Sequence, residues 1–133
     1  MMRNHAAWVA FLEARADLPF TWGRRANDCI SFAGQAVCAL TGDDVLARCG
    51  HDWTTRRGAL RVLAAVGGRA AAADLMLVRL KSPGLAQRGD VGLVETHAFR
   101  ALVVVEGHTL VGPGVNGLVR LPRAAMSLAW SAG

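Results

Sequence analysis

The sequence predicts an α+β fold with helices in the first part of the chain and a sheet in the second. Up to about residue 77, apolar side chains recur at helical spacing, whereas from Gly89 onward short runs rich in Val and Leu are separated by Gly, Pro and Asn. The length of 133 residues suits one domain, and a hydrophobic share of 53% is ample for a core. We therefore expect residues 1–133 to form a single domain in which N-terminal helices pack on a C-terminal antiparallel sheet.

Four helices are expected in the first part of the chain. They cover His5 to about Ala16, Asp28 to about Leu40, Thr55–Val66 and Ala70–Leu77. Asn27 or Asp28 is expected to cap the second helix and Thr54 the third, because short polar side chains accept hydrogen bonds from free N–H groups of the first turn. Gly42 is expected to end the second helix and Gly67 the third.

The second part of the chain predicts five strands. They cover Val91–Val94, Ala101–Val105, Thr109–Val111, Leu118–Leu121 and Leu128–Trp130. Glu106-Gly107-His108 predicts a tight turn, and the segment 112–117, which is rich in Gly, predicts a longer loop.

Composition and charge narrow the classes of function. The net charge is +5 and Lys81 is the only lysine, but the arginines are scattered and no nucleic-acid docking motif is present, so we expect no nucleic-acid partner. No run approaches the roughly 20 apolar residues of a membrane span. The apolar run near the N-terminus is interrupted by Glu13, Arg15 and Asp17, which favours an amphipathic helix over a signal peptide and predicts synthesis in the cytoplasm.

The three cysteines do not form a recognisable framework. Cys29, Cys38 and Cys49 are odd in number, and their spacing lacks the close pairs typical of zinc ligands. We expect no disulfide framework, no metal site and no cofactor.

Cys29 is the strongest candidate for chemistry, because it falls in the first turn of an expected helix. Free N–H groups and the positive end of the helix dipole stabilise a thiolate, which predicts a lowered thiol pKa and a nucleophile. The alternative is an ordinary small buried residue. Trp22 either lines a cleft beside Cys29 or seals the core, and Asp28 either orients a catalytic base or simply caps the helix.

Two motifs carry a family resemblance over about residues 18–121. Phe20-Thr-Trp-Gly followed by Asp28-Cys29 resembles the nucleophile motif of NlpC-type cell-wall endopeptidases, and Gly89-Asp90-Val91 resembles the Gly-Asp turn that opens their first core strand. The resemblance implies a papain-like fold. With Leu40-Thr-Gly42 and Gly117-Leu118, the layout is also similar to short phage and prophage proteins related to that fold. This second likeness implies a place at the tail tip or baseplate of a virion, with neighbouring tail proteins as partners.

The resemblance also implies a catalytic Cys, a His at the start of the strand after the Gly-Asp strand, and a third polar residue. Arg100 or Ala101 stands where that His is expected, and an arginine is no ordinary general base. His97 is a better candidate base than His108, and only Thr109 is available as the third residue. Two hypotheses follow: a structural or assembly protein with a degenerate site, or an active cysteine peptidase that uses Cys29 and His97 on peptidoglycan peptides.

Overall fold

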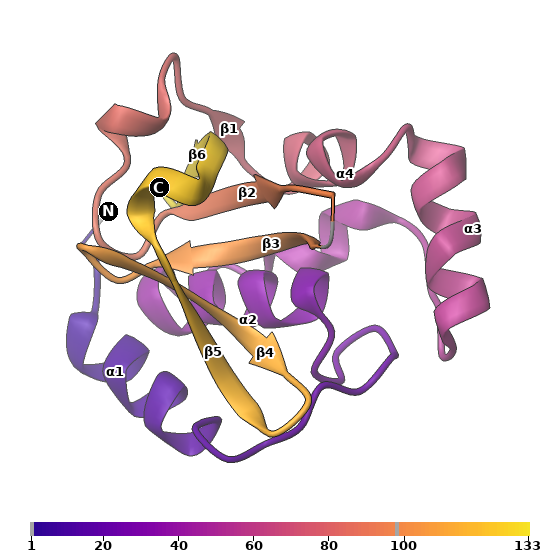
Figure 1. The fold of residues 1–133 in the computed structure, drawn as a ribbon, viewed down its shortest axis with the longest axis horizontal. Helices are drawn as coiled ribbons and strands as arrows, with labels where there is room; N and C mark the ends of the chain where they lie inside the picture. Colours follow the sequence, from indigo (N-terminus) through magenta and orange to yellow (C-terminus); the bar gives the residue numbers. More distant parts are fainter. Residues whose placement is uncertain (1, 98) are drawn as a thin grey trace.

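The computed structural model describes residues 2–97 and 99–133, which form an α+β fold (Figure 1). Within these residues there are four α-helices and one six-stranded sheet in the order β1-β6-β2-β3-β4-β5. Every neighbouring pair of strands in this sheet is antiparallel. The predicted class, with helices first and an antiparallel sheet second, is confirmed at this level.

The helices lie close to their predicted positions. They are α1 (His5–Ala14), α2 (Cys29–Thr41), α3 (Arg56–Val66) and α4 (Arg69–Met76). Asp28 caps α2 by accepting a hydrogen bond from the Ser31 N–H at 2.9 Å. The predicted Thr54 cap is wrong, because Thr55 caps α3 through the Gly58 N–H. Gly42 and Gly67 end their helices in the left-handed conformation, as predicted.

The strands include the five predicted ones and one that was not. They are β1 (Val78–Arg79), β2 (Val91–Glu95), β3 (Arg100–Val105), β4 (Thr109–Gly114), β5 (Gly117–Pro122) and β6 (Met126–Ser131). The longer loop predicted at 112–117 is wrong: β4 continues to Gly114 and pairs with Gly117, so only two residues connect β4 to β5. Gly112, Pro113 and Gly114, which favoured a loop, instead pair with β5 at the edge of the sheet. β1 was not predicted because it has only two residues and both are exposed, so it carries no apolar pattern.

Helix α2 lies at the centre of the fold, between α1 and the sheet (Figure 1). Its buried face is rich in small residues. A Cβ on Gly34 would overlap the Leu46 side chain, so the absence of a side chain lets the short helix Val45–Cys49 pack directly on α2.

The two ends of the chain meet at Asp90, the aspartate of the Gly-Asp turn. Asp90 is 2% exposed. It accepts hydrogen bonds from Arg3 at 2.6 Å, from the Gln87 N–H at 2.7 Å and from the Ala132 N–H at 2.9 Å. Asp90 therefore has a structural role, since it ties both chain ends to the start of β2. Among the described residues, no helix has the length and apolar character needed to cross a membrane.

Candidate functional site

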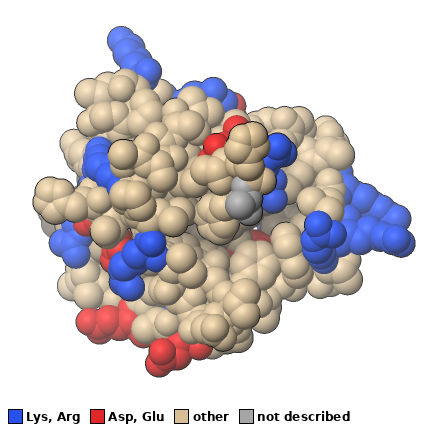
Figure 2. Space-filling view, in the orientation of Figure 1, with Lys and Arg blue, Asp and Glu red and all other residues tan. Residues whose placement is uncertain are grey.

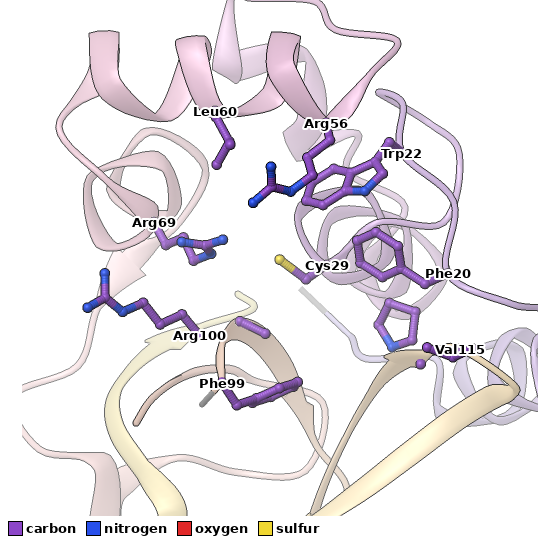
Figure 3. A pocket seen from close by; sticks show the side chains of 12 residues that line it. Phe20, Trp22, Cys29, Arg56, Leu60, Arg69, Phe99, Arg100 and Val115 are labelled. Carbon is purple, nitrogen blue, oxygen red and sulfur yellow. The ribbon is translucent and has the colours of Figure 1, made fainter. Parts of the chain in front are cut away.

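Cys29, the first residue of α2, lies in the wall of a cavity of about 350 Å³ (Figure 3). Five other parts of the fold complete the wall: the loop before α2, the N-terminal part of α3, the first turn of α4, the start of β3 and the end of β4. We call this space the Cys29 cavity. It opens where two neighbouring strands separate, since β3 pairs with β4 through Val104–Val111 and Val105–Leu110, at the opposite end of β3.

The start of β3, where the peptidase resemblance places the catalytic His, borders the Cys29 cavity and carries no suitable base. At the start of β3, where the His is expected, the wall is made by Arg100 and Ala101. On β4 the wall is made by Pro113 and Gly114. The candidate third residue Thr109 is wrong, because it lies at the other end of β4 and donates to Glu106 at 3.0 Å.

His97 lies in the connection between β2 and β3, in a different hollow from Cys29. This second hollow is bordered by Glu95, Thr96, His97 and Arg100, and His97 does not line the Cys29 cavity. Arg100 borders both spaces. The structure therefore brings Cys29 and Arg100 together but leaves His97 outside. His108 follows Val105, at the far end of β3 from the cavity.

Asp28 is a structural anchor for the start of α2. Besides capping the helix, its carboxylate accepts hydrogen bonds from the Gly23 N–H at 3.1 Å and from the Trp53 indole N–H at 2.7 Å. It is 2% exposed and does not line the Cys29 cavity. The capping interpretation is confirmed, and the carboxylate holds the loop before α2 against the segment that leads into α3.

Trp22 lies in the cavity wall and is half-buried against the core, so both interpretations of this side chain apply. Its ring meets Phe20 edge-on, with centroids 4.7 Å apart. The two aromatic side chains form one apolar wall of the Cys29 cavity (Figure 3).

Cys29 is 8% exposed, and the environment of its thiol opposes ionisation. Burial raises the pKa of Cys29, and this effect outweighs the lowering caused by a hydrogen bond from the Leu102 backbone and by the charge of Arg69. The expected lowering of the thiol pKa is therefore wrong for this structure. The free N–H groups of the first turn do not overcome desolvation, and one of them, on Ser31, is already bound by Asp28.

Three arginines line the Cys29 cavity: Arg56, Arg69 and Arg100. Arg56 and Arg69 point toward the sulfur, while Arg100 lies at the rim (Figure 3). Among the described residues, the ion pairs use five other arginines. The Arg69 Nε is buried without a hydrogen-bond partner.

Sequence reasoning missed Arg56 and Arg69. Neither residue belongs to a sequence motif. A signal was nevertheless present: each is the first residue of its helix, where a cation faces the positive end of the helix dipole. Such a placement is unfavourable by about 0.3–1 kcal/mol.

A model for a domain of unknown function, DUF6950, matches residues 2–132. The chain belongs to this family. The matched stretch contains every helix and strand of this DUF6950 chain and every wall of the Cys29 cavity. Neither the curated proteins nor the solved structures provide a match. The activity of the DUF6950 chain is therefore inferred from its own side chains. In the described part of the chain, no group of three or more His, Cys, Asp or Glu side chains could hold a metal ion.

Proposed function

We propose that this chain is a papain-like, NlpC-type domain with a degenerate catalytic site, and that it serves as a structural or assembly component of a phage or prophage tail tip or baseplate. Its partners would be the neighbouring tail proteins, and it would reach the virion tail after synthesis in the host cytoplasm. Three features support the papain-like assignment: Cys29 begins the central helix, that helix packs on an antiparallel sheet, and the Gly-Asp turn opens β2.

The observation that carries the loss of catalysis is the composition of the Cys29 cavity. Peptide hydrolysis by a thiol needs a group that removes the proton, within about 3 Å or through one water. The described residues that line the cavity include Arg100 and Arg69 but no His, Asp or Glu. A guanidinium stays protonated at ordinary pH and cannot take the proton. Because burial also keeps the thiol neutral, Cys29 lacks both a base and an activated state.

Clearing of purified cell walls tests the loss of catalysis. We expect wild type and Cys29→Ala to reduce the turbidity of a peptidoglycan suspension no faster than buffer does. Clearing by wild type that Cys29→Ala abolishes would overturn this part of the proposal.

Complementation tests the structural role. In a phage or prophage that lacks the gene for this chain, we expect few complete tails by electron microscopy. Wild type and Cys29→Ala should restore them equally. Normal tails in the deletion strain would contradict an assembly role.

The second candidate function is an active endopeptidase or amidase that cleaves peptidoglycan peptides with Cys29 and His97. The observation that favours it is the short β2–β3 connection, because His97 lies on the same connection as Phe99, which lines the Cys29 cavity. If wall clearing occurs, His97→Ala should abolish it and His108→Ala should not. Equal clearing by wild type and His97→Ala would exclude His97 as the base.

A further inference from the structure

The geometry points to the Cys29 cavity as a binding site for a carboxylate group carried on an apolar body, with Arg56, Arg69 and Arg100 as the groups that hold the carboxylate. This inference rests on the proposed function in one respect: it treats the cavity as a binding site and not a catalytic one. It adds the chemical class of the ligand.

The charge of the cavity is the first argument. All three arginines line a single space, and none of them is within ion-pair distance of an acidic side chain of the described residues. Like charges held together near an apolar wall repel one another unless an anion joins them. Figure 2 shows the same imbalance from outside, since basic side chains gather over the side of the molecule that α3 forms.

The helix ends add to this positive potential. α2, α3 and α4 each begin with a residue that lines the Cys29 cavity: Cys29, Arg56 and Arg69. Each helix is at least eight residues long and directs the positive end of its dipole toward this region. The buried, unpartnered Arg69 Nε offers a hydrogen bond that the protein itself does not use. Planar guanidinium groups match a carboxylate through paired N–H donors.

The apolar walls indicate what the carboxylate is attached to. Phe20, Trp22 and Pro113 line the interior of the cavity beside Cys29. At the mouth, three large apolar side chains are exposed: Leu60 at 37%, Phe99 at 39% and Val115 at 81%. A strongly hydrated inorganic anion would gain nothing from these surfaces, whereas a ligand with an apolar body would bury them. The volume of about 350 Å³ is at the small end of the range for ligand sites and suits a group of one or two residues in size.

Binding of matched acids and amides tests the inference. We would measure N-acetylleucine against N-acetylleucinamide by calorimetry, and in parallel the peptide acetyl-Ala-Ala-Leu with a free or an amidated C-terminus. Both acids should bind, and both amides should bind at least about tenfold more weakly, because an amide lacks the charge that the guanidinium groups recognise. A lower Kd for N-acetylleucine would identify the ligand as a free small acid. A lower Kd for acetyl-Ala-Ala-Leu would identify it as the C-terminus of a protein chain.

Matched arginine variants locate the site. Arg56→Gln and Arg69→Gln should each weaken binding of the acids at least about tenfold. Arg57→Gln is the control, since Arg57 is the exposed neighbour on α3, carries the same charge and does not line the cavity. Bound acid should also slow the alkylation of Cys29.

Four results would overturn the inference. These are no binding of either acid at millimolar concentration, equal binding of acid and amide, equal weakening by Arg57→Gln and Arg56→Gln, and displacement of the acids by an equal concentration of inorganic phosphate. None of them affects the wall-clearing test, so the inference about the ligand and the proposal of a degenerate site fail separately. Because Arg56 is exposed, its variant should fold as wild type does.

Discussion

At the scale of single residues, Cys29 shows that a position typical of a nucleophile does not ensure its reactivity. The thiol lies at the start of a helix, but its burial opposes the charge that the helix end favours. The outcome is a matter of magnitude: a helix terminus contributes about 0.3–1 kcal/mol, whereas desolvation of a buried group can shift a pKa by several units. A neighbouring base would be needed to reverse this balance.

Alkylation rates check the state of the Cys29 thiol. We expect iodoacetamide to modify Cys29 in the folded protein at pH 7 more slowly than in the same protein unfolded in urea, because the native pKa lies above that of a free thiol. The rate in the folded protein should rise only at pH values above about 8.5, the ordinary thiol pKa. Peptide-resolved mass spectrometry separates Cys29 from Cys38 and Cys49.

The raised pKa also has a thermodynamic consequence of definite sign. The unfolded chain loses the Cys29 proton at a lower pH than the native protein does, so stability is full below about pH 8.5 and falls as the pH rises toward the native pKa. Cys29→Ala should remove this part of the alkaline slope. Faster labelling in the folded protein than in urea at pH 7 would contradict both expectations.

At the scale of elements, close packing against α2 determines which side chains the central helix tolerates. An alanine inside a helix is favoured over glycine by about 1 kcal/mol, so Gly34→Ala would be stabilising on propensity alone. At position 34, however, the added Cβ would overlap Leu46, which is fully buried and cannot withdraw. The steric overlap with Leu46 should therefore outweigh the gain in helix propensity.

We therefore expect Gly34→Ala to lower the free energy of unfolding by about 1–3 kcal/mol, measured by urea denaturation. Gly84→Ala is the matched control. Its added Cβ would come no closer than 3.6 Å to a neighbouring side-chain atom, and we expect a change within about 0.5 kcal/mol. A Gly34→Ala variant as stable as wild type would show that the Val45–Cys49 segment repacks freely.

The elements also show what the sequence could and could not predict. The central helix and strands 2 to 6 were predictable because their apolar periodicity and caps are local signals, and Asp28 behaves as its position before α2 indicates. The β4–β5 hairpin was predicted too short because Pro113 and Gly114 are poor strand formers that cross-strand pairing nevertheless holds. Arg56 and Arg69 joined the site only through tertiary structure, since α3 and α4 bring together positions that are 13 residues apart with no shared motif.

At the scale of the whole molecule, the Arg3–Asp90 pair joins the first helix to the sheet and to the last strand. The Arg3 guanidinium also donates to the Arg88 carbonyl at 2.9 Å and to the Gly133 carbonyl at 3.2 Å. The two side chains are 15% and 3% exposed, so removal of one partner leaves a buried charge unpaired.

Arg3→Gln should therefore lower the free energy of unfolding by about 3 kcal/mol, measured by chemical denaturation. Arg25→Gln is the control, because the Arg25–Asp44 pair has nearly the same length, 2.7 Å, but both side chains are almost half exposed. We expect a change of no more than about 1 kcal/mol there. Equal decreases in the free energy of unfolding of the two variants would mean that the burial of Asp90 does not strengthen the Arg3–Asp90 pair.

The meeting of the two chain ends also determines how the molecule can be tethered. Arg3 and Gly133 lie together on one side of the fold. The helices α3 and α4, which contribute residues to the wall of the Cys29 cavity, lie on the other side (Figure 1). A tag, a surface anchor or a fused protein at either end would leave from the same point and keep the cavity facing outward. Immobilised through its ends, the chain would present the arginine-lined opening to whatever approaches.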